Sequence, residues 1–152
     1  MSAADSDPPI GKRGIAARIP HAGAMCLLDR VISWDRTMIA CAAISHTDPE
    51  NPLRAGGCLP AIAGIEYAAQ AMAMHGSLTG EGGRPTAGYL ASVREVVCSV
   101  ERLDLLQGAI IVTAELLIAE GARVIYRFDL TCGGQPVLRG RAAVVIDAGP
   151  SG

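Results

Sequence analysis

The sequence is poor in aromatic side chains. Of its 152 residues only five are aromatic, namely Trp34, Tyr67, Tyr89, Tyr126 and Phe128. The core must therefore be built mainly from Ala, Val, Ile and Leu, with Met filling gaps. Hydrophobic residues make up 50% of the chain, which is enough for one compact domain with a sizeable core.

An excess of charge of one sign is also lacking. The formal net charge of -2 provides no global attraction to nucleic acid or to an anionic membrane, so we expect neither partner. The five cysteines are widely spread, and none forms a CxxC pair or a Cys/His cluster with metal-ligand spacing. We therefore expect no metal and no other cofactor, with reduced thiols in a cytoplasmic protein.

Long hydrophobic runs are absent as well. No apolar segment approaches the ~20 residues that a membrane-spanning helix needs. Residues Met1–Lys12 are polar and lack the apolar core of a signal peptide. The sequence thus predicts a soluble cytoplasmic protein, with a disordered N-terminal tail over residues 1–13 and a single domain over residues 14–148.

The first third of the chain predicts two strands and a long loop. Met25–Ser33 and Thr37–Ser45 are typical of strands, and the polar join Trp34–Arg36 suits a hairpin. The Pro- and Gly-rich stretch His46–Leu59 predicts a loop. Loops of this length are often functional.

The segment Pro60–His75 predicts the one clear helix. Pro60 suits a first-turn position, Ala and Met are good helix formers, and Gly76 can end the helix. Its residues are apolar on nearly every side, which indicates a buried central helix.

The rest of the chain predicts antiparallel strands. β-branched residues and partial alternation favour strands at Ala87–Val93, Glu95–Val100, Ala109–Ile118, Arg123–Cys132 and Val137–Ile146. Glycine-containing turns join the last three. Two strands, a buried helix and a run of strands predict an α+β fold in which an antiparallel sheet wraps around the helix.

Glu66 is the unusual residue of the predicted helix. An ionised carboxylate is costly to bury in apolar surroundings unless it has partners. Gln70 lies one helical turn further on the same face, and the small side chains of Ala69 and Ala73 beside it leave room for a ligand. The alternative is a structural carboxylate at a dimer interface or one that faces solvent.

Other candidates surround the helix. The backbone N–H groups of Ala61 to Gly64 point toward the preceding loop and can polarise a carbonyl. Cys58, just before the helix, is a candidate nucleophile. Among the histidines, His75 near the predicted helix end suits a C-terminal dipole partner, whereas His21 and His46 lie in loops.

Three stretches carry a family resemblance. IPHAGAMCLLDRV at residues 19–31 resembles the PHR-PFLLVDRV segment of the hot-dog (3R)-hydroxyacyl-carrier-protein dehydratases. PAIAGIEYAAQ at residues 60–70 resembles their central-helix motif PGVLIIEALAQ, in register for the Pro, the Glu and the Gln. GYLASV at residues 88–93 resembles the strand that borders their acyl tunnel. The wording of the helix is still more similar to a subgroup of predicted dehydratases found in aryl-polyene clusters.

The resemblance implies a fold, a reaction and a partner. The fold is the hot-dog fold, and the reaction eliminates water from a 3-hydroxyacyl thioester held by an acyl carrier protein or coenzyme A. Glu66 would be the acid, and the active site would lie between two subunits of a homodimer or of a heterodimer with a related hot-dog subunit. The implied substrate-binding residues are Asn51, Ala61, Gly64, Gln70 and Tyr89, with the Ala61 N–H in the place of the family's glycine donor.

One departure affects the implied mechanism. Close relatives carry their proton-abstracting histidine in a GHFP motif, and Pro52 beside Asn51 occupies that place here. An asparagine can hold a hydroxyl or water but cannot act as a base. His21, His46 or a partner subunit would then supply the base. Three functions remain open: a dehydratase, a hot-dog thioesterase that uses Glu66, and a non-catalytic partner of an active dehydratase.

Overall fold

The computed structural model describes residues 10–19, 23–80 and 87–147. Three short 3₁₀ turns, at Gly23–Met25, Ser45–Thr47 and Ala61–Ala63, accompany the main elements. The helices and strands, in chain order, are β1 (Ile10–Gly11), α1 (Lys12–Ala16), β2 (Arg30–Trp34), β3 (Met38–Ala43), α2 (Gly64–Thr79), β4 (Ala87–Cys98), β5 (Ile110–Glu120), β6 (Arg123–Cys132) and β7 (Gln135–Asp147).

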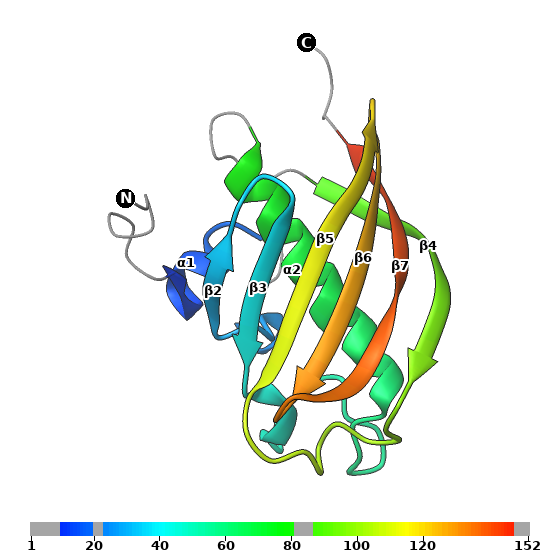
Figure 1. The fold of residues 1–152 in the computed structure, drawn as a ribbon. Helices are drawn as coiled ribbons and strands as arrows, with labels where there is room; N and C mark the ends of the chain where they lie inside the picture. Colours follow the sequence, from blue (N-terminus) through cyan, green and yellow to red (C-terminus); the bar gives the residue numbers. More distant parts are fainter. Residues whose placement is uncertain (1–9, 20–22, 81–86, 148–152) are drawn as a thin grey trace.

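The described strands form one antiparallel sheet that curves around α2 (Figure 1). The strand order is β1-β2-β3-β5-β6-β7-β4, so that β1 and β4 are the edge strands. Helix α2 contacts β3, β5, β6 and β4 on one face of the sheet. This arrangement confirms the predicted α+β hot-dog fold.

Alternation of side chains explains why the long strands form. In β6 the side chains of Tyr126, Phe128 and Leu130 are buried toward the helix, whereas Arg127 is exposed on the other face. A strand with one apolar and one polar face is stable only when its apolar face is covered. The predicted strand Arg123–Cys132 is confirmed with the same bounds.

The first strand begins later than predicted. Residues 25–33 were expected to form one strand, but β2 starts at Arg30. The Leu27 N–H donates to Oε1 of Gln70 at 2.9 Å, and the Met25 carbonyl accepts from Nε2 of the same side chain at 2.6 Å. This segment therefore pairs with a helix side chain instead of a neighbouring strand.

The two strands predicted at residues 87–93 and 95–100 are one continuous strand, β4. Its register shifts at Arg94–Val97, and Glu95 there has a φ of 55°. A bulge of this kind bends a strand without ending it. Gly140 lies opposite, where an added Cβ would lie 2.8 Å from the Phe128 ring and 3.2 Å from the Arg94 carbonyl oxygen. The bulge and this glycine let β4 approach β7 closely.

The central α-helix both starts and ends later than the predicted segment Pro60–His75. The turn at Ala61–Ala63 leads into α2, which runs to Thr79 and includes Gly76. The predicted end at Gly76 is therefore wrong. The Thr79 hydroxyl donates to the His75 carbonyl oxygen at 2.8 Å, and the Gly80 N–H donates to the Gly76 carbonyl oxygen at 2.9 Å. These bonds and the burial of Ser77 hold the last turn in place.

The structure also orders part of the expected tail. Ile10 and Gly11 pair with Val31 and Arg30 of β2, and α1 begins at Lys12. Ile15 of α1 is fully buried in the core. Residues 1–9 lie outside the described residues.

Candidate functional site

Glu66 lies in the first turn of α2, one helical turn before the first helix residue that lines a small apolar pocket. Its side chain is half-buried and interacts with other groups of the protein. The pocket, of about 70 Å³, begins one helical turn further on and lies between α2 and strands β4, β6 and β7. It is lined by Ala69, Met72, Ala73, Gly76, Leu90, Tyr126, Val144 and Ile146. The space thus lies where the small side chains of Ala69 and Ala73 predict it.

Tyr126 forms one wall of the pocket, and a hydrogen bond holds its hydroxyl in place. The hydroxyl of Tyr126 lies 2.8 Å from Nδ1 of His75, and Nε2 of His75 lies 2.9 Å from the carbonyl oxygen of Asp35. Burial raises the pKa of Tyr126 to about 12 and lowers the pKa of His75 below its usual value. His75 is thus a buried core residue, and the expectation of a dipole partner at the helix end is wrong because the helix continues past it.

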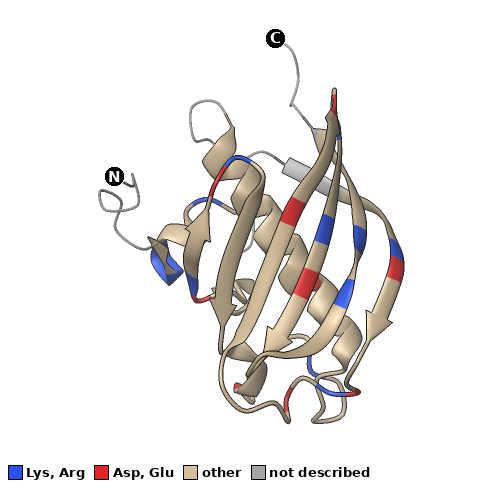
Figure 2. Cartoon of the chain, viewed as in Figure 1, with Lys and Arg blue, Asp and Glu red and all other residues tan. Residues whose placement is uncertain are grey.

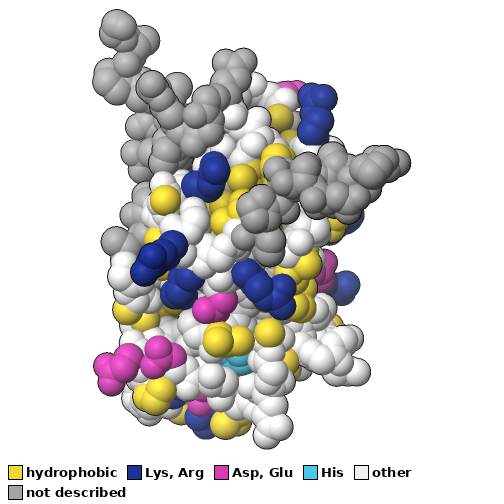
Figure 3. Space-filling view, turned by 90° about the vertical axis from the view of Figure 1, so that its left-hand side faces the viewer, with side chains coloured by type: hydrophobic (Ala, Val, Ile, Leu, Met, Phe, Trp, Pro, Cys, Tyr) yellow, Lys and Arg dark blue, Asp and Glu magenta, His cyan; other side chains and the backbone are white. Residues whose placement is uncertain are grey.

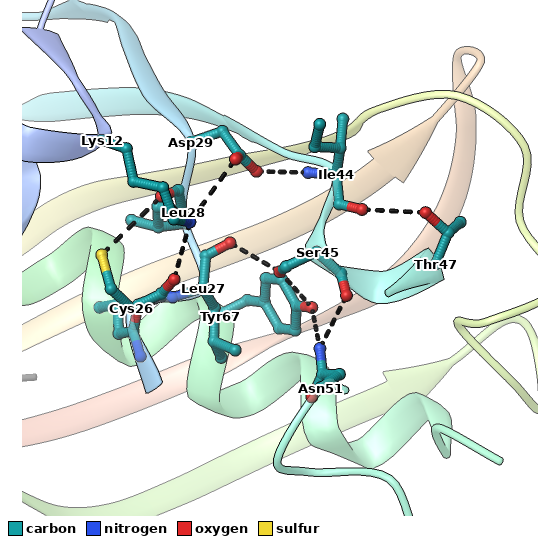
Figure 4. Close-up of polar contacts among 11 residues, drawn as sticks. Lys12, Cys26, Leu27, Leu28, Asp29, Ile44, Ser45, Thr47, Asn51 and Tyr67 are labelled. Atoms are coloured by element: carbon teal, nitrogen blue, oxygen red, sulfur yellow. Dashed lines mark hydrogen bonds and ion pairs between the residues drawn. The ribbon is translucent and has the colours of Figure 1, made fainter. Parts of the chain in front are cut away.

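A second polar network ties the long loop to the helix (Figure 4). Nδ2 of Asn51 donates to the Ser45 carbonyl oxygen at 2.9 Å and to the Tyr67 hydroxyl at 3.0 Å. Oδ1 of Asn51 accepts from the Leu53 N–H at 2.9 Å. Asn51 is only 6% exposed. Its amide is therefore engaged by the chain itself at both ends.

The direction of the remaining bond in this network follows from the donors. The Ser45 hydroxyl donates its one hydrogen to the Leu27 carbonyl oxygen at 2.7 Å. The Tyr67 hydroxyl, 2.8 Å from Oγ of Ser45, must then donate to Ser45 and accept from Asn51. Burial raises the pKa of Tyr67 above its usual value, so this phenol remains a donor. Asn51, which precedes the Pro52 position, therefore attaches the long loop to α2.

His46 lies just before this loop and is fully buried. Its Nε2 lies 3.1 Å from the Leu106 carbonyl oxygen, and its Nδ1 has no hydrogen-bond partner among the described residues. Burial lowers the pKa of His46, so its ring is neutral at pH 7. The side chain is directed at the β4–β5 loop. His21, the other candidate base, lies outside the described residues.

The start of the central helix is covered by the β4–β5 loop. The Ala61 N–H donates to the Glu101 carbonyl oxygen at 2.9 Å, and the Leu59 N–H donates to Oδ1 of Asp104 at 2.9 Å. Arg102 pairs with Asp104 at 2.5 Å and holds the pKa of that carboxyl far below its usual range. The Ala61 N–H is therefore already bonded, which differs from the expectation of an open carbonyl-binding donor at this position.

The other predicted binding residues are placed as follows. Gly64 faces the sheet, where an added Cβ would lie 2.7 Å from Cδ2 of Leu138, so it allows close packing of α2 on β7. Gln70 is fully buried and bonds the Met25–Leu27 backbone with both ends of its amide. The backbone of Tyr89 pairs with Val145 in β4 and β7, and its side chain is outside the described part of the structure.

Neither a metal site nor a membrane segment is found in the described parts of the chain. No cluster of three or more His, Cys, Asp or Glu there could hold a metal ion. No helix in residues 10–19, 23–80 or 87–147 has the length and apolarity to cross a membrane. All five cysteines are free thiols, and Cys58 is half-buried beside the loop that covers the helix start.

Charges of both signs share the outer surfaces. On the sheet face turned away from α2, acidic and basic residues alternate across β5, β6, β7 and β4 (Figure 2). Arg127 pairs there with Glu115, and Nε of Arg141 lies 3.2 Å from Oε2 of Glu95. On the side of the molecule seen in Figure 3, lysine and arginine side chains lie next to exposed hydrophobic ones, with a few acidic residues between them.

A long helix wrapped by one antiparallel sheet defines a protein of the hot-dog fold. A family model described as ApeP-like, ApeP dehydratase, matches residues 13–148. The chain belongs to this ApeP-like dehydratase family. No match was found among curated proteins.

Solved structures show the same fold. "The Dehydratase Heterocomplex ApeI:P" from Xenorhabdus doucetiae contains a chain similar to this one, with a TM-score of 0.72, 23% identity, and coverage of 88% of this chain and 90% of that chain. Zebra fish thioesterase superfamily member 2 is similar with a TM-score of 0.61, 18% identity, and coverage of 88% and 91%. The Escherichia coli PaaI protein, from an operon for phenylacetic acid degradation, has a TM-score of 0.58 and 13% identity, with coverage of 78% and 79%.

Proposed function

We propose that this protein is a dehydratase subunit that eliminates water from 3-hydroxyacyl thioesters during polyene-type chain synthesis. The substrate is carried by an acyl carrier protein or coenzyme A. A base removes the α-proton, the C–O bond at the 3-position breaks, and the product is the 2-enoyl thioester. Glu66 donates the proton that leaves with the hydroxyl as water.

The observation that carries the proposal is the position of Glu66. It is the acidic residue in the first turn of α2, and the apolar pocket begins one turn further on at Ala69. A carboxyl group one helical turn from an apolar pocket, on the same helix face, is placed to act on the polar end of a substrate whose alkyl chain lies in the pocket. Membership of the ApeP-like dehydratase family supports this chemistry.

We further propose that the protein works together with a second hot-dog subunit. Asn51 lies next to the place of the family's histidine, and its amide is bonded to Ser45, Tyr67 and Leu53. The amide side chain of Asn51 cannot abstract a proton. Strand β4 is an edge of the sheet and carries exposed Leu90, and such edges are commonly covered by pairing. The similarity to a chain of the ApeI:P heterocomplex agrees with a related subunit as partner.

The test compares the chain alone with the chain co-purified with the related hot-dog subunit that we propose as its partner. Each is incubated with 3-hydroxyacyl and with saturated acyl thioesters on carrier protein. The proposal predicts an enoyl product, found with the pair or with the chain alone, and light scattering should give at least a dimer. Release of free thiol would instead make the protein a thioesterase, and neither product from any combination would refute the enzymatic role.

A further inference from the structure

Helix α2 contains two glycines in different surroundings. At Gly64 an added Cβ would lie 2.7 Å from Cδ2 of Leu138 and 2.9 Å from Cδ2 of Leu130. Packing on the sheet therefore accounts for this glycine. At Gly76, no atom of the described residues lies within 4 Å of the position that a Cβ would take, and its φ is not positive.

Within the described part of the chain, no steric contact accounts for Gly76, and its backbone conformation does not require a glycine. A glycine inside a helix is less stable than an alanine, because its backbone loses more freedom on folding. Gly76 nevertheless occupies the last turns of a helix that packs in the core. What distinguishes the position is that it faces the apolar pocket together with Ala69 and Ala73.

The pocket-facing positions continue from Glu66 along one side of the helix. Ala69, Ala73 and Gly76 follow Glu66 at intervals of three or four residues, so they lie on one face. At about 1.5 Å per residue, Gly76 lies about 15 Å further along the helix axis than Glu66. Gly76 is therefore at the end of the pocket that is remote from the carboxylate.

Tyr126, which forms part of the opposite wall, is held in place. The Tyr126 ring is held by its hydrogen bond to His75, which is itself bonded to the Asp35 carbonyl oxygen. The pocket is small, at about 70 Å³, and Gly76 is one of its lining residues. A single added methyl group would take up a large share of this space.

We propose that Gly76 is the residue that determines the chain-length specificity of the acyl pocket. Its missing side chain leaves room for the terminal carbons of an acyl chain whose thioester end lies near Glu66. This inference rests on the proposed function, because it takes the Glu66 end as the reacting end.

The test measures binding, so that it does not depend on activity. Non-reactive thioether analogues of acyl-coenzyme A, from butyryl to hexadecanoyl, are titrated against the full-length protein by calorimetry. For the wild type, affinity should rise about fourfold for each methylene that is buried, up to a maximum length. For Gly76→Ala that maximum should move to shorter chains, with roughly tenfold weaker binding of the longest chain that the wild type accepts. Gly76→Leu should shorten it further.

Ser77→Ala is the matched control. Ser77 is adjacent in the helix, is buried, does not line the pocket, and its hydroxyl has no partner among the described residues. Both alanine variants should keep or raise the melting temperature, because alanine favours the helix. Only Gly76→Ala should change the length profile.

The outcomes separate the two proposals. A wild type that binds chains with a length limit, together with a Gly76→Ala variant of unchanged limit, would overturn the role of Gly76 and leave the proposed function intact. A shift that also occurs in Ser77→Ala would overturn it as well, because the cause would then be helix stability. A wild type that binds no analogue of any length, either alone or with its partner subunit, would refute the acyl-thioester function and this inference with it.

Discussion

The Tyr126 hydroxyl donates its hydrogen bond to Nδ1 of His75, 2.8 Å away. This direction follows from the other ring nitrogen, because Nε2 of His75 faces the Asp35 carbonyl oxygen at 2.9 Å and must carry the hydrogen. The imidazole is therefore neutral and fixed in one tautomer. A helix residue, a strand residue and a hairpin carbonyl are joined through a ring that is fully buried.

This arrangement predicts loss of stability in acid. Burial lowers the pKa of His75 and of His46 below the ordinary value of 6.5. The unfolded chain then binds protons at a higher pH than the folded chain does. The stabilisation is fully present above a pH of about 6.5 and is lost as the pH falls through the lower, folded-state pKa values. The melting temperature should therefore decrease below that pH.

The contribution of His75 can be separated with His75→Gln. Glutamine keeps one donor and one acceptor but does not titrate. The variant should be less stable than the wild type at neutral pH because its geometry is poorer, but its melting temperature should change less with pH. The same pH dependence in wild type and variant would show that the acid sensitivity comes from other groups.

Glu66→Gln should abolish the reaction without unfolding the protein. The amide is nearly isosteric with the carboxyl group but cannot deliver a proton, and general acid–base catalysis usually contributes about 10²–10⁴-fold. Enoyl product is measured with the assembled protein. Glu120→Gln, at an exposed position at the end of β5, is the control and should keep full activity. An active Glu66→Gln variant would rule out Glu66 as the acid.

The two candidate histidines should respond differently to substitution. His46→Gln should remain active, because the glutamine amide nitrogen reaches the position of Nε2 and can donate to the Leu106 carbonyl oxygen, which Nε2 of His46 contacts at 3.1 Å. His21→Ala should lower turnover by about 10²–10⁴ if this chain supplies its own base. Turnover is compared at equal concentrations of folded protein. Loss of activity in His46→Gln at unchanged stability would assign the base to His46, and full activity in both variants would assign it to the partner subunit.

Asn51 and Tyr67 should be energetically coupled. Removing either partner leaves a buried polar group unpaired, which usually costs about 1–3 kcal/mol. Asn51→Ala and Tyr67→Phe should each lower the free energy of unfolding in urea. The double variant should lose less than the sum of the two, because their 3.0 Å hydrogen bond is counted in both single changes. Strict additivity would mean that this bond contributes nothing to the attachment of the loop.

Much of the architecture is predictable from local patterns. Alternation along Arg123–Cys132 predicts β6 with its observed bounds, because one face of the strand is buried and the other is not. The run of good helix formers predicts the central helix, but the turn after Pro60 is 3₁₀ and the α-helix begins at Gly64. The end of the helix is not predictable in the same way. Gly76 is a terminator in isolation, but the buried His75 and Ser77 keep the last turn helical.

The candidate site likewise has residues that local sequence predicts and residues that it does not. Glu66, Ala69 and Ala73 are predictable because residues three and four apart share a helix face, and that spacing depends on the helix alone. Tyr126 was missed as a pocket residue. It comes from a strand 51 positions away from its partner His75, and nothing local in the sequence indicates that the two meet.

The sequence by itself determined the fold class, the acidic residue on the central helix and the absence of the family's histidine, because each is a property of residue type and local spacing. Only the tertiary structure decided what surrounds them. It engaged the amides of Asn51 and Gln70 in bonds within the chain, buried His46 and His75, and joined the Ala61 N–H to the Glu101 carbonyl oxygen. Hydrogen-bond partners of buried polar groups come from segments remote in the sequence, so they are fixed only when the elements pack together.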